Sequence, residues 1–217
     1  MKQNKTFVKK SLGQNFLTNK KIVQRIIQTA ELKPSDTVLE IGPGLGALTF
    51  DLAQKAKKVI AIEKDGGLSQ ALNEELKKRG ANNVEVLNED ALNFQFSIFN
   101  FQIMPTDQFS NYKLISNLPY NVATKIIMNF LESKNPPKQM VVMVQKEVAQ
   151  RICASPPQMS KLAVFCQLYS QPTICFYVAK GNFFPKPKVD SAVIKFENIR
   201  LPALLRQPDS LTAVMAA

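Results

Sequence analysis

A buried strand that runs straight into a glycine-rich turn constrains the fold of this chain more than any other stretch. The apolar run Thr37–Ile41 is followed by GPGLG at 42–46, which contains Gly42 and Gly44, and a helical stretch comes next. Glycines let the backbone approach a ligand closely, and the N-terminus of the following helix points toward that ligand. Together these features predict the first unit of an α/β fold that binds a ligand at this turn.

An acidic residue follows the next predicted strand, about 20 residues beyond the turn, where nucleotide-binding α/β folds hold a ribose. The strand Val59–Ile62 ends in Glu63, whose carboxylate can accept hydrogen bonds from both ribose hydroxyls. The turn and the acid together predict a bound nucleoside, although the turn by itself fits NAD as well as S-adenosylmethionine. A further strand, Val84–Leu87, leads to Asp90, which either accepts the amino group of the cofactor's adenine or caps a turn.

The run SNLPYN at 116–121 carries the groups that a reaction on a planar base requires. It follows a short buried strand, Tyr112–Ser116, and precedes a helical stretch, so it lies at the carboxyl end of a strand, where ligands bind. The Asn117 side-chain oxygen and the Leu118 carbonyl can accept both N–H groups of an exocyclic amine such as that of adenine. Tyr120 can stack on the base. The alternative is an ordinary Asn-Pro turn packed by a tyrosine.

The charge of the chain points to a polyanionic partner. The 217 residues carry a net charge of +11, and the first 30 hold seven Lys or Arg and no acid. Nucleic acid is the leading candidate. A later stretch, 181–190, joins two phenylalanines, Phe183 and Phe184, to alternating prolines and lysines, a combination that suits single-stranded nucleic acid. Either ring can instead pack beneath this loop.

Composition excludes several classes of chemistry. The chain has no histidine, which removes Ser-His and Cys-His catalysis and histidine-ligated metals, and we expect no metal site. Three cysteines without Cys-x-x-Cys spacing fit free thiols in a reducing compartment, the cytoplasm. The sequence has no apolar run as long as the roughly 18 residues of a membrane span, and no secretory signal, so we expect no membrane partner.

Two further stretches are expected to border the site. Gln14, Asn15 and Phe16 form a plausible lip for a nucleoside, or else a polar loop that hydrophobic neighbours tether to the core. A helix capped by Thr18 or Asn19 should follow. The phenylalanine-rich, non-periodic stretch 93–108 is expected to be a covering loop.

Five motifs occur in the order and spacing of the bacterial small-subunit ribosomal RNA adenine N6-dimethyltransferase family (KsgA type), which this chain resembles from about residue 8 to residue 196. They are GQNFL at 13–17, EIGPGLG at 40–46, NLPYN at 117–121, QKEV at 145–148 and PKVDSAV at 187–193. The resemblance implies an α/β class I S-adenosylmethionine-dependent methyltransferase fold. Such a fold is Rossmann-like, with a seven-stranded, mainly parallel sheet.

The same resemblance implies an activity and a partner. It implies methyl transfer from S-adenosyl-L-methionine to two adjacent adenosines near the 3′ end of small-subunit (16S) rRNA, in ribosome biogenesis. The partner would be this rRNA or the pre-ribosomal small subunit, and the protein would act as a monomer. The implied cofactor contacts are Asn15, Leu17, Gly42, Gly44, Glu63, Asp90 and Asn117. The implied catalytic residues are Asn117, Leu118, Tyr120 and Phe183, with the target base between Tyr120 and Phe183.

The sequence departs from the family pattern at three places. Lys64 stands where the family usually has an apolar residue, and the segment 159–162 lacks the Tyr-Gly that the family often shows before its leucine. Family members also continue into a small helical C-terminal domain, which is expected to be missing here. Residues 1–197 would form the methyltransferase domain with its basic N-terminal arm. Residues 198–217 would form a short tail or a remnant of the C-terminal domain.

Two other functions remain open. One is the macrolide-resistance type of methyltransferase that acts on large-subunit rRNA, which shares the glycine turn and an Asn-x-Pro-Tyr-Asn motif. The other is a non-catalytic nucleic-acid-binding factor derived from the same fold. The runs NLPY and KVDSAV favour the small-subunit enzyme, and the intact acids and Asn117 favour retained chemistry.

Overall fold

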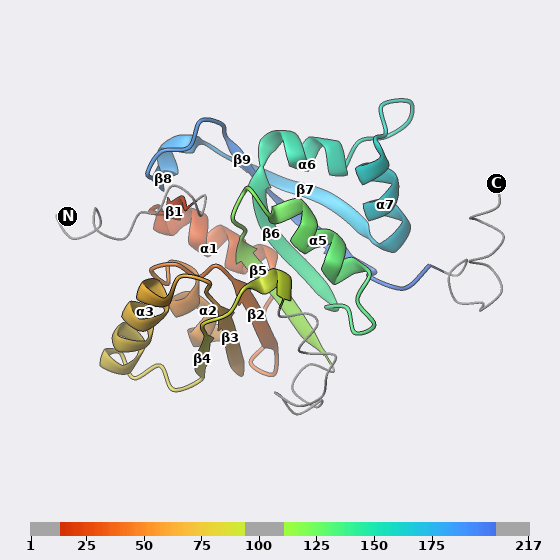
Figure 1. Cartoon of the computed structure of the whole chain (residues 1–217). Coiled ribbons are helices and arrows are strands. Elements are labelled where there is room, and N and C mark those ends of the chain that lie inside the picture. The colour runs from red at the N-terminus through yellow and green to blue at the C-terminus, as the bar shows by residue number, and fades with distance from the viewer. Residues whose placement is uncertain (1–13, 94–110, 203–217) are drawn as a thin grey trace.

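The computed structural model describes residues 14–93 and 111–202, and one seven-stranded sheet organises them (Figure 1). The strand order is β4-β3-β2-β5-β6-β9-β7. The strands are β2 (Thr37–Ile41), β3 (Lys58–Ile62), β4 (Val84–Leu87), β5 (Tyr112–Asn117), β6 (Gln139–Gln145), β7 (Gln171–Val178) and β9 (Ser191–Glu197). The first five in this order pair in parallel, and β9 runs antiparallel to both β6 and β7. The predicted mainly parallel sheet is therefore confirmed.

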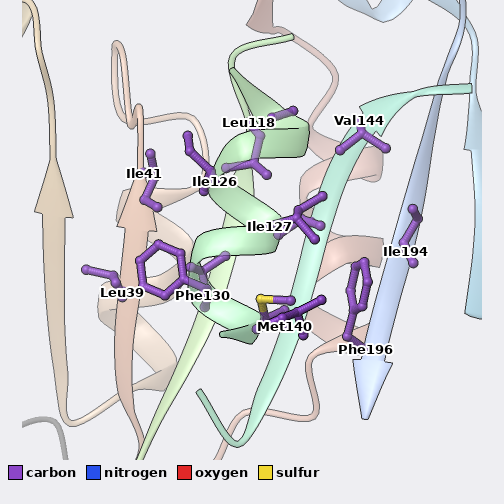
Figure 2. Close-up of a cluster of buried hydrophobic side chains, with 14 of the residues drawn as sticks. Leu39, Ile41, Leu118, Ile126, Ile127, Phe130, Met140, Val144, Ile194 and Phe196 are labelled. Atoms are coloured by element: carbon purple, nitrogen blue, oxygen red, sulfur yellow. The ribbon is translucent and has the colours of Figure 1, made fainter. Parts of the chain in front are cut away.

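Helices cover both faces of this sheet, as the alternation of side chains along its strands requires. The helices are α1 (Lys20–Thr29), α2 (Thr49–Lys55), α3 (Gly66–Lys78), α5 (Ala123–Leu131), α6 (Lys146–Ile152) and α7 (Lys161–Tyr169). On β2, Val38 joins a buried cluster with α1 and α2, whereas Leu39 and Ile41 join a second cluster with α5, α6 and α7. Figure 2 shows part of that second cluster between α5 and the strands. Two buried faces explain why the strands read as continuous apolar runs.

Side-chain caps set where two of the helices begin. The Asn19 side chain accepts a hydrogen bond from the Lys21 backbone N–H at 2.9 Å, as expected for the N-cap of α1. Helix α3 begins at Gly66, two residues before its first apolar side chain, Leu68. Asp65 Oδ1 accepts from the N–H groups of Gly67 and Leu68, at 2.9 and 3.3 Å, and this cap draws the flexible glycines into the first turn.

A buried charge cluster fixes the amino-terminal edge of the sheet, away from the turns described above. Lys113 on β5 is 6% exposed, and its Nζ donates to the carbonyls of Ala30 and Glu31 at 2.8 and 2.9 Å. It also lies 3.0 Å from Asp36 Oδ2, while the more exposed Lys138 bonds Asp36 Oδ1 at 2.7 Å. Burial acts to raise the pKa of Asp36, but these hydrogen bonds outweigh it and bring that pKa to about 2.

A small second sheet ties the two ends of the described chain together. Strand β1 (Phe16–Leu17) pairs antiparallel with β8 (Phe183–Phe184), and Phe16 lies opposite Phe184. Asn182 reinforces the pairing: its carbonyl accepts from the backbone and hydroxyl of Thr18, each at 2.9 Å, and its Oδ1 accepts from Asn19 Nδ2 at 2.7 Å. The lip expected near residues 14–16 is thus held against the loop that precedes β9.

Two expectations meet the limits of the described ranges. Residues 94–108 of the covering loop lie outside them, and so do residues 203–217 of the tail. In the part of the chain that the structure does describe, no helix has the length and apolar character needed to cross a membrane.

Candidate active site

A cavity of about 390 Å³ opens at the carboxyl ends of β2, β3 and β5. The strand order reverses at β2, since β3 lies on one side of it and β5 on the other, and ligands bind at such switch points. The sequence-predicted residues that line this cavity are Asn15, Leu17, Gly42, Gly44, Glu63, Asp90, Asn117, Leu118 and Tyr120. Segments more than 100 residues apart in the sequence therefore meet here, and only Phe183 of the predicted set is absent from the lining.

The glycine turn approaches its neighbours as closely as its sequence predicts. Gly42 and Gly44 have φ of +67° and +59°, a conformation that side chains disfavour. A Cβ on Gly42 would lie 3.2 Å from Pro119 Cγ, and one on Gly44 would lie 2.9 Å from Phe16 Cε1. The turn therefore packs between Pro119 of the 117–121 motif and Phe16. A side chain at either glycine would clash there, so the turn can border the cavity only without one.

Glu63 holds the turn as well as facing the cavity. It is 6% exposed, Oε2 accepts from the Gly44 N–H at 3.1 Å, and Oε1 accepts from the Asp65 N–H at 2.9 Å. Burial raises the pKa of Glu63, and the two backbone donors act against this rise. Each carboxylate oxygen keeps a second lone pair, so the predicted hydrogen bonds to a ribose remain possible from a side chain that is already fixed in orientation.

Asp90 is at the cavity, but its carboxylate already has partners. Oδ1 accepts from the Leu92 N–H at 3.0 Å, and Oδ2 accepts from Lys64 Nζ at 2.8 Å. The bond from Lys64 is the largest of the effects that hold the pKa of Asp90 below its usual value. Asp90 therefore caps a local turn, as one of the two alternatives predicts, and it also lines the cavity, where Lys64 shares its outer oxygen. Its contact with the cofactor's adenine stays a prediction.

Asn117 lines the cavity and has a buried acceptor that no described residue uses. Its Nδ2 donates to the Asn15 carbonyl at 3.1 Å, which fixes the amide plane. Its Oδ1 is buried and accepts no hydrogen bond from any residue that the structure describes. The Leu118 N–H donates to the Met143 carbonyl of β6 at 3.1 Å, which holds the turn in register with the sheet. An oriented, buried acceptor without a donor is costly in isolation, and a ligand N–H would satisfy it.

Tyr120 is anchored by a residue that the sequence analysis did not single out. Its hydroxyl and the Ser191 Oγ form a hydrogen bond, and Ser191, at the start of β9, is buried. The partner lies 71 positions away in the chain, so no local pattern could identify it. The hydrogen bond sets the position of the ring at the rim of the cavity.

Phe183 does not stand where the resemblance implied. Its side chain is 4% exposed and packs in the buried cluster with Leu17, Phe176 and Val178, outside the cavity lining. The pairing of β8 with β1 causes this, because it turns Phe183 to the same side as Leu17. Phe184, on the opposite side of the strand, is 39% exposed. The structure thus does not bring Phe183 into the cavity lining beside Tyr120, and its stacking on the target base stays a prediction.

Glu40 lines the cavity, although the sequence did not single it out as a site residue. It belongs to the EIGPGLG run and is the one acid in the mostly apolar strand β2. It is 2% exposed, it lines the cavity, and its Oε2 accepts no hydrogen bond from a described residue. Burial raises the pKa of Glu40 to about 8, with a further rise from the charge of Glu63 and an opposing effect of the Thr49 hydroxyl.

The residues present fit an adenosine nucleoside that carries a charged amino-acid group. The glycine cradle would be filled by a Cβ, the buried Asn117 and Glu40 oxygens lack donors, and Glu63 faces the cavity with free lone pairs. No group of three or more His, Cys, Asp or Glu side chains within 14–93 and 111–202 could hold a metal ion.

Comparison with known proteins places this geometry in a family. The chain is 42% identical over 187 residues to the ribosomal RNA small subunit methyltransferase A of Dehalococcoides mccartyi, an alignment that covers 86% of this chain and 62% of that relative. This chain therefore spans about three fifths of the length of that relative.

Two solved structures share the fold. A dimethyladenosine transferase from Plasmodium falciparum is 32% identical, with a TM-score of 0.72, over 84% of this chain and 62% of that one. The 23S rRNA methyltransferase ErmE is 31% identical, with a TM-score of 0.74, over 91% of this chain and 75% of that one. The fold is that of the class I S-adenosylmethionine-dependent methyltransferases, as the resemblance implied. Because the family model described as "Ribosomal RNA adenine dimethylase" matches residues 5–209, this chain belongs to the ribosomal RNA adenine dimethylase family.

Proposed function

We propose that this chain transfers methyl groups from S-adenosylmethionine to the N6 amines of two adjacent adenosines near the 3′ end of small-subunit rRNA, acting as a monomer in the cytoplasm. The observation that carries the proposal is the buried, unpartnered Oδ1 of Asn117 in the wall of a nucleoside-sized cavity. Methyl transfer to an exocyclic amine needs such an acceptor, because the amine must be held with its lone pair aimed at the methyl donor.

In this proposal some residues orient the target amine and another stacks on the target base. When bound, S-adenosylmethionine supplies an electrophilic methyl group on a sulfonium. The Asn117 oxygen accepts one N–H of the target amine, the Leu118 carbonyl accepts the other, and the Tyr120 ring packs on the base. The amine nitrogen becomes strongly acidic once it has gained the methyl group, so its proton can leave to water. Catalysis therefore needs no imidazole, and the chain contains none.

Glu63 is proposed to bind the cofactor ribose, and this gives a direct test. We expect Glu63→Ala to weaken S-adenosylmethionine binding about tenfold or more, on the order of the 1.5 to 3 kcal/mol of hydrogen bonds to a charged group. Isothermal calorimetry measures this, and NAD should give no heat with either protein. Glu74→Ala removes an exposed acid of α3 away from the cavity lining and serves as the control. Unchanged affinity in Glu63→Ala would refute the ribose assignment.

The proposed RNA surface lies beside β8 and α6. Lys146, Arg151, Lys186 and Lys188 are exposed, and Lys146 Nζ lies 5.1 Å from the centroid of the exposed Tyr177 ring. Lys9 and Lys10, which the sequence also suggests, lie outside the described residues. Cations next to an aromatic face suit the backbone and bases of single-stranded RNA.

We expect RNA affinity to fall steeply with salt, by roughly 0.7 to 0.9 log units per log unit of salt for each phosphate contacted. The double variant Lys186→Ala/Lys188→Ala should lower the magnitude of this slope by about 1.5. The variant Lys77→Ala/Lys78→Ala on α3 makes the same change in charge and should leave the slope unchanged. Filter binding from 50 to 300 mM salt measures both, and equal slopes in all three proteins would contradict the proposed surface.

The choice of ribosomal subunit needs its own experiment. The likeness to ErmE favours the large-subunit alternative, whereas the curated relative named as a small-subunit enzyme favours the proposal. Labelled methyl groups should pass to small subunits that lack this modification and not to large subunits offered in parallel. Label in large subunits alone would select the alternative, and cofactor binding without label in either subunit would support a non-catalytic binding factor.

A further inference from the structure

Tyr177 is an exposed aromatic residue near the carboxyl end of β7, the edge strand of the sheet. It is 51% exposed, whereas its neighbours Phe176 and Val178 are buried in the cluster with α1 and α2. Lys146, the first residue of α6, places its Nζ over the Tyr177 ring, 5.1 Å from the ring centroid. A single exposed tyrosine is ordinary on a protein surface. This one has a cation over its ring and still keeps half of its surface open.

The register of the sheet places Tyr177 at the same edge as the cavity. Strand β9 is antiparallel to both β6 and β7, so β7 ends at the edge where β5 and β6 end. Ser191, whose Oγ bonds the Tyr120 hydroxyl, pairs with Val178. The next pair in this register is Ala192 with Tyr177. Neighbouring strands lie about 5 Å apart, so Tyr177 stands one strand beyond the residue that anchors the Tyr120 ring.

The loop before β9 holds cations near the exposed ring. The Asp190 carbonyl accepts from the Lys146 N–H, and Asp190 Oδ1 accepts from the Lys180 N–H, each at 2.9 Å. Lys180 Nζ in turn donates to the Lys188 carbonyl at 3.4 Å. All three lysines are exposed. The acids among these residues are Asp190, which these bonds occupy, and the exposed Glu147, so this part of the surface is basic.

We propose that Tyr177 and Lys146 form a second base-binding site, which stacks a nucleotide that flanks the target adenosine in single-stranded RNA. The inference rests on the proposed function, because it takes the base at Tyr120 to be part of an RNA strand. Every base has a face that can stack on an aromatic ring, and the neighbouring lysines suit the phosphates on either side of it. A strand that leaves the cavity across the start of β9 passes close to Tyr177.

Binding of a short single-stranded RNA with two adjacent adenosines at its centre tests this site. Tyr177→Ala should weaken the binding roughly tenfold, the order expected for the loss of one stacked base. Tyr177→Phe should keep the parent affinity, because the ring face rather than the hydroxyl makes the contact. Leu168→Ala removes an exposed apolar side chain of α7 and should also bind as the parent does.

Salt dependence separates the stacked base from the phosphate contacts. The Tyr177 ring carries no charge, so Tyr177→Ala should lower the affinity by the same factor at every salt concentration. Lys146→Met should instead lower the magnitude of the salt slope by about 0.7, the value for one phosphate of a single strand. A changed slope in Tyr177→Ala would show that its effect is electrostatic and would contradict stacking.

A scan with abasic nucleotides identifies the base that Tyr177 contacts. RNAs that lack the base at one position at a time are bound to the parent protein and to Tyr177→Ala. At one flanking position the missing base should weaken binding to the parent roughly tenfold and leave Tyr177→Ala unaffected, as a double-mutant cycle requires of a direct contact. Coupling at no flanking position, or only at the target adenosine, would overturn the inference.

The remaining outcomes separate this site from the proposed function. If Tyr177→Ala binds the RNA as the parent does but binds small subunits more weakly, the occupant of the site is a protein and the inference fails. If the parent protein transfers label to small subunits and no base couples to Tyr177, the second site fails but the proposed function stands. If the parent protein neither binds RNA nor transfers label, both fail.

Discussion

Replacing Asn117 by alanine is expected to lower kcat about 10²-fold or more while S-adenosylmethionine affinity stays within about tenfold. The variant removes an acceptor in the cavity wall that is buried, held in orientation and without a donor among the described residues. Misplacing a reacting group by about 1 Å can cost 10²-fold in rate, and the amine would lose one of its two holding contacts. Single-turnover methyl transfer separates this chemical step from cofactor binding.

The matched control is Asn82→Ala, which removes an exposed amide between α3 and β4, away from the cavity lining. It should turn over at the parent rate. Since Asn117 also donates to the Asn15 carbonyl, circular dichroism and cofactor binding must show that the lip is intact in Asn117→Ala. Turnover at the parent rate in this variant would remove the basis for the proposed mechanism.

Replacing Lys113 by methionine is expected to destabilise the fold by about 3 to 5 kcal/mol, the range for breaking a buried ion pair from one side. The substitution leaves Asp36 Oδ2 without its buried counter-ion and deprives the Ala30 and Glu31 carbonyls of their donor. For a chain of this size, the melting temperature should fall on the order of 10 °C. Lys138 contacts the same carboxylate, but its side chain is 36% exposed. Lys138→Met should therefore lower the free energy of unfolding by about 1 kcal/mol or less.

The same cluster predicts the acid side of the stability curve. The folded pKa of Asp36 is about 2, against an ordinary value of 3.8, so the unfolded chain binds a proton at a higher pH than the folded protein. The stabilisation from Asp36, about 2 kcal/mol, is present above pH 4 and is lost as the pH falls from about 4 to about 2. Asp36→Asn should lack this component. Urea unfolding of both proteins across this range measures the difference, and parallel curves would contradict the assignment.

Local patterns predicted those parts of the site that are themselves local. The glycine turn, the acid at the end of β3 and the NLPYN turn each follow a strand directly, and the sheet brings strand ends to one edge. The conformation of a turn depends on a few adjacent residues, and the parallel sheet then places the ends of its strands side by side. The predicted lining residues therefore meet in one cavity.

The features of the site that local patterns did not predict depend on contacts between residues far apart in the chain. Phe183 is buried because β8 pairs with β1, which lies more than 160 positions earlier in the chain, and no motif encodes that register. Asp90 meets Lys64 across 26 positions, and Tyr120 meets Ser191 across 71. The sequence did not single out Glu40 either, because its burial and the lack of a donor for its Oε2 among the described residues depend on the folded structure.

The pairing of β1 with β8 has a consequence for the order in which this protein becomes competent during synthesis. The glycine turn and Asn117 leave the ribosome well before residues 183 and 184, which hold the lip in place. A nascent chain that has emerged only as far as β6 therefore has the chemistry of the site without one of its walls. We therefore expect a nascent chain to bind the cofactor tightly only after β8 has emerged and paired with β1.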